Sequence, residues 1–294
     1  MSGLPSRLVQ PAKKKHRLKI GHGGTLDPLA SGVLLVGFGD ACKLSHDFQE
    51  CYKTYVATAV FGVGTDSYDM DGKIISKGNP QSISDTHLRN ALQKFTGVIM
   101  QRPPLHSAIQ VNGVRLYDYA RSGQTFSEPI MERTTRIRRI DLDLFDTAPD
   151  LTTLSPVLKA VDQMVQYRKQ REGETPDESV SLLEAAVRDS DLPSPIICGI
   201  SQSVENIVPH LQGLPAFRIT VEAAGGTYIR SLVRDIGEYL GCPATLIDLV
   251  RTRQGDYALD ETTPNLLQCR DPRVIDRQLV PFKKESISGQ LAEF

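Results

Sequence analysis

The residues best suited to chemistry lie in one glycine-rich stretch, GHGGTLDPLASG, which spans residues 21–32. Asp27 directly precedes Pro28, whose ring disfavours the α conformation and pushes the aspartate towards an extended one. The glycines permit sharp turns and close approach of a ligand to the backbone. Such a loop can present a carboxylate to a flat ligand. Because an aspartate in such a loop also commonly caps a turn, these residue types alone leave both roles open.

The chain lacks the residue spacings of a phosphate-binding loop, a disulfide framework or a metal site. The glycine-rich stretch lacks the G-x-x-x-x-G-K-[ST] pattern of a phosphate-binding loop. The five cysteines are scattered without a C-x-x-C pair, and no histidine lies at a ligand-like spacing from another histidine or a cysteine. We therefore expect no disulfide framework and no metal site.

The elements that follow the glycine-rich stretch must position its carboxylate. The apolar run Val33–Val36, bracketed by glycines, predicts a short strand buried on both faces. Tyr55–Phe61 is rich in β-branched and aromatic residues and predicts a second strand, and a polar turn region covers Thr65–Gly72. Between Ser84, a suitable N-cap, and Gly97, apolar residues at helical spacing predict an amphipathic helix.

Two later segments alternate between apolar and polar residues and predict half-exposed strands. These segments are Ile140–Leu144 and Phe217–Glu222, and we expect them to pair in antiparallel fashion. After a Gly-Gly pair the apolar spacing becomes helical and ends at Gly241, so Tyr228 and Arg230 lie at a strand-to-helix junction. Strands grouped between isolated helices favour an α+β fold.

Charge is distributed unevenly along the chain, whose net charge is −1. Residues 148–212 carry five basic and ten acidic side chains and indicate an acidic, partly helical and partly mobile insertion. The remainder carries a charge of +4, with basic clusters at Lys13–Lys19 and over Arg133–Arg139. Such clusters are typical of phosphate contacts, targeting signals or ordinary solvated surface. No apolar run approaches the roughly 20 residues that cross a bilayer, and the start lacks a secretory signal, so we expect no membrane role.

Five motifs occur in the order in which the TruB family of pseudouridine synthases carries them. GHGGTLDPLASG closely resembles the family's central G-x-L-D-P-x-A-x-G motif. The other four are K-x-Y at residues 53–55 with the stretch to Gly72, the segment from Q-x-P-P to Y-x-x-A-R at 101–121, GTYIRSL at 226–232 and L-x-R-x-R at 249–253. Because the motifs cover residues 20–145 and 216–260, the chain is identified as similar to this family.

The resemblance implies a pseudouridine synthase fold, a mixed, mostly antiparallel sheet flanked by helices and loops. It also implies a cofactor-free isomerase that flips a uridine out of folded tRNA, at a cost of a few kcal/mol. Asp27 matches the family's catalytic aspartate, Tyr55 the residue that stacks on the target base, and Arg230 the arginine that pairs with the aspartate. Whether Asp27 attacks the ribose or the uracil ring stays open.

Further residues resemble those that contact the RNA in this family. His22 resembles the histidine that helps to open the T loop, and Tyr228 and Leu249 resemble residues that line the uracil pocket. Each of these types is also common in ordinary protein cores. The residues expected to contact phosphates are Lys53, Arg121 and Arg253.

The chain departs from the family at both ends. The family's opening K-P-x-G strand is absent from the basic segment 1–19, and the extension 261–294 is too short for the PUA domain of bacterial relatives. We expect a catalytic domain formed by 20–147 and 213–260, with 148–212 inserted. This organisation resembles the fungal, stand-alone branch, which modifies the T-loop uridine at position 55 of tRNA.

The same branch sets the expected partners and location. We expect a monomer acting on the tRNA T-arm, with T-loop-like mRNA hairpins as further candidate substrates, in the nucleus or mitochondrion. The cytoplasm is a further candidate location. The alternative is a catalytically weakened module of the same fold that binds or folds tRNA without turnover.

Overall fold

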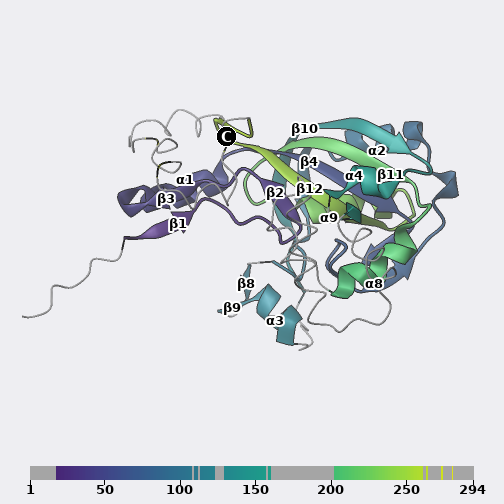
Figure 1. Ribbon diagram of the computed structural model, residues 1–294, viewed down its shortest axis with the longest axis horizontal. Helices are drawn as coiled ribbons and strands as arrows, with labels where there is room; N and C mark the ends of the chain where they lie inside the picture. The colour runs from purple at the N-terminus through teal and green to yellow at the C-terminus, as the bar shows by residue number, and fades with distance from the viewer. Residues whose placement is uncertain are drawn as a thin grey trace, which may run out of the picture.

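A seven-stranded sheet forms the centre of the described part of the chain in this computed structural model (Figure 1). The described residues are 18–107, 109–111, 113–122, 129–156, 158–159, 202–260 and the single positions 263, 273 and 280. The strands follow the order β13 (Tyr257–Ala258), β12 (Ala244–Gln254), β4 (Lys53–Phe61), β11 (Ala216–Ala223), β10 (Arg133–Asp146) and β7 (Gly97–Gln101). All of these neighbours are antiparallel, and β2 (Ala30–Gly32) adds a parallel pairing to β12. The mixed, mostly antiparallel sheet confirms the predicted α+β class.

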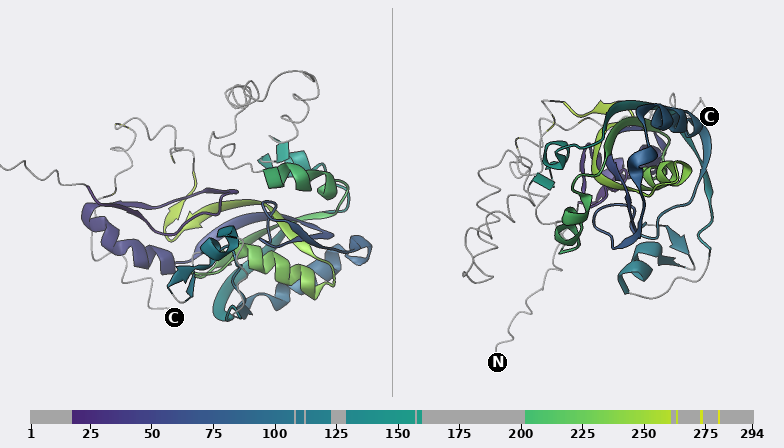
Figure 2. Two further views of the ribbon diagram at one scale, coloured as in Figure 1. Left: turned by 90° about the horizontal axis from the view of Figure 1, so that it is seen from below. Right: turned by 90° about the vertical axis from the view of Figure 1, so that its right-hand side faces the viewer.

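Helices cover both faces of this sheet. Helices α2 (Asp85–Lys94) and α9 (Ile229–Tyr239) pack on one face, and α4 (Leu151–Leu154) and α8 (Gln202–Leu211) lie on the other (Figure 2). Because β4 is central and covered on both sides, five consecutive residues, Ala57–Phe61, are buried. The core therefore continues through the sheet.

The strongest sequence patterns form the predicted elements. Strand β4 contains the predicted Tyr55–Phe61 run, and β10 and β11 pair in antiparallel fashion as expected. The Ser84 hydroxyl caps α2 by accepting a hydrogen bond from the backbone N–H of His87 (3.2 Å). Helix α9 begins directly after Tyr228, which confirms the strand-to-helix junction.

The predicted strand Val33–Val36 is wrong. Its first three residues lie between two short strands, β2 and β3 (Val36–Phe38), and Val36 begins β3, which pairs with β1 (Ile20–His22). Gly32 turns the chain with a φ of 108°, after which Leu34 and Val36 are 43% and 46% exposed. Four adjacent apolar residues resemble a doubly buried strand, but here the chain leaves the sheet edge too soon for both faces to be covered.

The remaining elements surround the sheet. The 3-10 helix η1 (Gly39–Leu44) and α1 (Ser45–Glu50) extend with the β1–β3 pair from one end of the sheet (Figure 1). The others are β5 (Val63–Thr65), β6 (Ile74–Lys77), the 3-10 helix η2 (Pro80–Ser82), β8 (Gln110–Val111), β9 (Val114–Arg115) and α3 (Leu116–Ser122). Within the described residues, no helix is long and apolar enough to cross a membrane.

Several sequence predictions fall on residues outside the described ranges. They concern most of the basic cluster Lys13–Lys19, the central part of the insertion and nearly all of 261–294. The described ends of the insertion belong to the core. Their buried residues are Leu151, Leu154, Leu158, Val204, Ile207 and Leu211.

We predict that Gly32→Ala destabilises the fold more than Gly97→Ala does. The two glycines have similar φ values, 108° and 101°, so each alanine would carry comparable backbone strain, on the order of 1–2 kcal/mol. Only at Gly32 would the added Cβ overlap the carbonyl oxygen of Arg251, whereas nothing lies within 4 Å of it at Gly97. Urea unfolding of both variants measures the difference, and equal losses would contradict the role of this close approach.

Candidate active site

Asp27 and Arg230 form a two-pronged ion pair at the centre of the candidate site. The Nε atom of Arg230 donates to one carboxylate oxygen of Asp27, and one terminal nitrogen donates to the other, both at 2.8 Å. The Arg230 side chain is only 4% exposed, while that of Asp27 is 31% exposed. The pair therefore holds the carboxylate in one orientation and leaves part of it accessible to a ligand.

The same guanidinium joins the glycine-rich loop to two other segments. Its terminal nitrogens donate to the backbone carbonyls of Ser67 (3.0 Å) and His106 (2.9 Å). Asp69 lies 3.5 Å away as a second carboxylate. Arg230 thus connects α9, the turn after β5 and the segment after β7, and these segments form the walls around Asp27.

Asp69 is a buried carboxyl group whose hydrogen bonds are local. It accepts from the Ser67 hydroxyl (2.5 Å) and from the backbone N–H of Asp71 (3.0 Å). Burial raises the pKa of Asp69 to about 6, although the charge of Arg230 opposes the rise. The two carboxylates beside Arg230 therefore differ in environment: Asp27 is open and paired, and Asp69 is enclosed.

The start of α9 is held by a buried glutamine. The Gln101 side-chain oxygen accepts from the backbone N–H of Tyr228 (2.8 Å), and its nitrogen donates to the backbone carbonyl of Tyr228 (3.0 Å). Because Tyr228 is the N-cap and Arg230 lies in the first turn, Gln101 fixes the start of the helix that carries the arginine. The Asp27 carboxylate near this helix start is also favoured by the helix dipole.

Two tyrosines and a leucine bring apolar surface to the site. Burial raises the pKa of the Tyr55 hydroxyl, Arg251 opposes the rise, and the charge of Asp27 adds to it. Burial likewise raises the pKa of Tyr228, and the negative charge of Asp27 raises it further. Leu249 is buried in β12, where its partners are Ala57 of β4 and Ala30 of β2. The site thus combines an anchored carboxylate with flat and apolar side chains.

Side chains of strand β12 anchor the glycine-rich loop by hydrogen bonds to its backbone. The fully buried Arg251 donates from Nε to the carbonyl of Val33 (2.7 Å) and from a terminal nitrogen to that of Gly24 (3.1 Å). Gln254, three residues further along, donates to the carbonyl of Gly23. Since these carbonyls lie on both sides of Asp27, β12 fixes both ends of the loop that presents the carboxylate.

The other residues predicted to contact RNA differ in their exposure and in their hydrogen-bond partners. His22 lies exposed in β1, and Arg253 lies exposed in β12 with its Nε donating to the Gly255 carbonyl (2.8 Å). Lys53 is buried, and its ammonium donates to three carbonyls at the end of α1. Burial lowers the pKa of Lys53, and these contacts suit a structural role better than a phosphate contact. Arg121 belongs to α3, and its side chain lies outside the described residues.

Sequence reasoning missed four residues that build the site: Asp69, Gln101, Arg251 and Gln254. Asp69, Gln101 and Arg251 stand within the recognised motifs without an assigned role. Arg251 interrupts an otherwise apolar stretch of β12, and a charged residue in a buried strand requires polar partners. A charged residue within an otherwise apolar strand was therefore the sequence signal for Arg251.

Comparison with known proteins gives consistent matches. Two family models match, one described as TruB family pseudouridylate synthase (N terminal domain) at residues 12–156 and one as tRNA pseudouridylate synthase B C-terminal domain at residues 230–283. The tRNA pseudouridine synthase 4 of Schizosaccharomyces pombe is 34% identical over 279 residues, 85% of this chain and 68% of the relative. That of Saccharomyces cerevisiae is 32% identical over 88% of this chain and 66% of the relative. The tRNA pseudouridine synthase B of Lactobacillus delbrueckii is 34% identical, with 83% and 61% covered.

We predict that Arg251→Lys loosens the glycine-rich loop. A lysine keeps the charge but cannot reach two separate carbonyls with a planar fork, so the loop loses an anchor. Hydrogen exchange of the amides in residues 21–33 should accelerate by about tenfold, which corresponds to roughly 1.4 kcal/mol of local opening.

The matched control for this prediction is Arg218→Lys. Arg218 also donates to a backbone carbonyl, that of Leu154 (3.0 Å), but on the sheet face that carries α4. Exchange in residues 21–33 should stay at the wild-type rate in that variant. Acceleration of the same amides by both substitutions would show a general loss of stability and contradict the anchoring role.

We predict that Asp69 makes the protein less stable as pH rises from about 4 to 7. Its folded pKa of about 6 lies above its ordinary value of 3.8, so the unfolded chain loses this proton first and the free energy of unfolding falls. A shift of about two units corresponds to at most about 3 kcal/mol. The Asp69→Asn variant lacks this contribution, so its stability relative to the wild type should increase between pH 4 and pH 7 in urea unfolding. A difference that does not change with pH would contradict the raised pKa.

Proposed function

Because the chain belongs to the TruB family of tRNA pseudouridine synthases, we propose that it isomerises a uridine of tRNA to pseudouridine with Asp27 as the nucleophile. We further propose that the target is the T-loop uridine at position 55. The observation that carries the proposal is the two-pronged pair of Asp27 with Arg230. It holds a carboxylate in one orientation while 31% of its side chain stays exposed.

The reaction needs a nucleophile but no external reductant or oxidant. The bond between the ribose C1′ and uracil N1 breaks, a bond from C1′ to C5 forms, C5 loses its proton and N1 gains one. Asp27 can assist by attacking C1′ or the uracil ring, and covalent attachment divides one difficult step into two easier ones. Each route leaves the ring close to the carboxylate while it turns.

The surroundings of Asp27 suit a flipped base. Tyr55 supplies a flat face on β4, and Tyr228 and Leu249 supply further apolar surface. Stacking and edge contacts of this kind offset the cost of removing a base from its stack. The pairing of Arg230 with backbone carbonyls as well as with Asp27 keeps the cation from moving with the substrate.

The expected substrate is the folded T-arm of tRNA. This chain spans 61–68% of the length of the relatives named above. The substrates of those whole proteins are therefore assigned to this chain as part of the proposal. A T-arm stem-loop is the smallest RNA that contains the proposed target.

We predict that Asp27→Asn lowers the rate of the reaction by at least about a thousandfold, because an amide cannot act as the nucleophile. A T-arm transcript labelled with tritium at uridine C5 should release its label with the wild-type protein and keep it with the variant. Gel-shift binding of the transcript should stay within about threefold of wild type.

The control for this experiment is Asp143→Asn, the same chemical change on the exposed part of β10, where the carboxylate accepts a hydrogen bond from Thr220 (2.7 Å). It should release label at the wild-type rate. An unchanged rate in Asp27→Asn would overturn the assignment of the nucleophile. Binding without release by the wild-type protein would favour a tRNA-binding module without turnover.

A further inference from the structure

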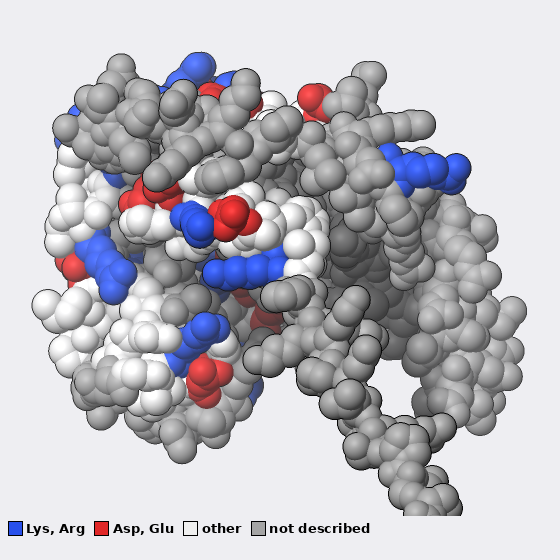
Figure 3. All heavy atoms as spheres, turned by 90° about the vertical axis from the view of Figure 1, so that its left-hand side faces the viewer, with Lys and Arg blue, Asp and Glu red and all other residues white. Residues whose placement is uncertain are grey.

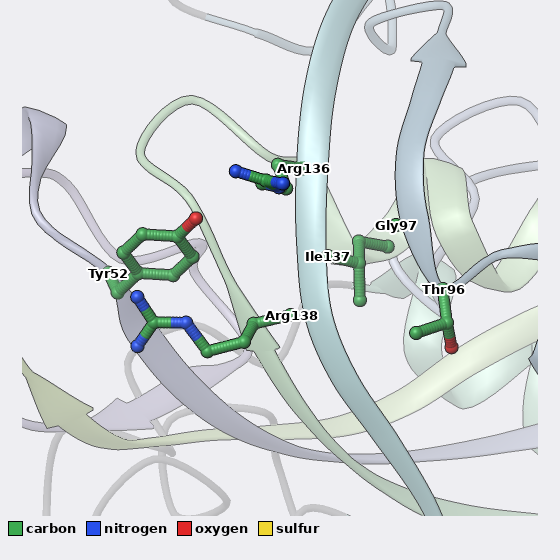
Figure 4. Close-up of a pocket in the computed structure, with 6 residues that line it drawn as sticks. All are labelled: Tyr52, Thr96, Gly97, Arg136, Ile137 and Arg138. Carbon is green, nitrogen blue, oxygen red and sulfur yellow. The ribbon is translucent and has the colours of Figure 1, made fainter. Parts of the chain in front are cut away.

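A pocket lies beside the start of β4, apart from the residues around Asp27. It has a volume of about 350 Å³ and is lined by Tyr52, Thr96, Gly97, Arg136, Ile137 and Arg138. Figure 4 shows Arg136 and Arg138 reaching from β10 to the same side as Tyr52, while Ile137 between them points to the other side. This alternation follows from the geometry of a strand, and it places two cations and one aromatic ring together.

Tyr52 is held in place from two directions. The Arg138 guanidinium lies over its ring, with the central carbon 3.8 Å from the ring centroid. The backbone carbonyl of Tyr52 accepts a hydrogen bond from the N–H of Gly255 (2.9 Å). Arg138 is itself paired with Glu222 (2.6 Å), so much of its charge is already compensated. The aromatic ring is thus a fixed surface.

Arg136 differs from its neighbours because its charge has no partner within the described residues. Its side chain is exposed, and among those residues it forms no ion pair or hydrogen bond, whereas Arg138 and Arg139 are paired with Glu222 and Asp141. On the face drawn in Figure 3, basic side chains stand next to acidic ones, so its described part shows no continuous basic surface. Within this pocket, Arg136 is therefore a cation without a compensating partner among the described residues, and it lies beside the Tyr52 ring.

We propose that this pocket binds a nucleotide of the RNA substrate away from the target uridine. Arg136 contacts a phosphodiester oxygen, and Tyr52 provides a stacking surface for the adjoining base or ribose. Tyr52 precedes β4 and Tyr55 is its third residue, so their Cα atoms are separated by about 10 Å of extended chain. The inference rests on the proposed function, since it takes RNA as the substrate.

The test is the salt dependence of binding. Affinity of the whole protein for a T-arm stem-loop is measured by fluorescence anisotropy over a range of KCl concentrations. Loss of one phosphate contact in Arg136→Gln should reduce the magnitude of the slope of log K against log salt by about 0.7–0.9. Arg89→Gln is the matched control, because Arg89 is an exposed arginine on α2 that is already paired with Asp85 (2.6 Å). It should keep the wild-type slope.

A second pair of variants tests the stacking surface. Tyr52→Leu should weaken binding by about fivefold or more, and Tyr52→Phe should bind as the wild type does, because the ring and not the hydroxyl is used. A wild-type slope in Arg136→Gln, or an equal change in Arg89→Gln, would overturn the proposal.

The binding readout separates this inference from the proposed function. If the wild-type protein releases no label from C5 but the slope changes as described, the isomerase proposal fails and the RNA contact stands. If label is released and the slope does not change, only the RNA contact fails.

Discussion

The geometry of the site depends on one buried cation. Arg230 is almost fully enclosed, and removing its charge from water would cost several kcal/mol if nothing compensated it. Compensation comes from Asp27, from Asp69 and from the carbonyls of Ser67 and His106. Because the guanidinium is planar, these partners must lie in set directions around it, so satisfying the buried charge also fixes the position of the Asp27 carboxylate.

A second buried arginine anchors the backbone of the loop that carries Asp27. Arg251 and Gln254 bind backbone carbonyls of the glycine-rich loop, and Gly32 lets β2 come close enough to β12 for this to happen. The loop is therefore held through its backbone and leaves its one carboxylate available. A loop fixed in this way loses little freedom when a ligand binds, which favours a well-defined orientation of the Asp27 carboxylate.

The parts of the fold that could be predicted are those with a regular pattern over several residues. Strands β10 and β11 and helices α2 and α9 formed as expected, because period-two or helical spacing reflects which face meets the core. The run Val33–Val36 failed because four apolar residues carry no period, and their burial depends on what lies beside them. The ends of the insertion, Leu151 and Leu211 among them, pack in the core although the composition of the whole segment is acidic.

The sequence by itself determined the family and the α+β class and singled out Asp27 as the candidate carboxylate, because ordered motifs and local periodicity are properties of the chain. It also indicated that Tyr228 and Arg230 lie where a strand gives way to a helix. Only the tertiary structure decided which groups surround Asp27, since Arg230 is 203 residues away along the chain. It also showed Lys53 buried against the end of α1 and Arg251 holding the loop, because burial and hydrogen-bond partners arise only when distant segments pack together.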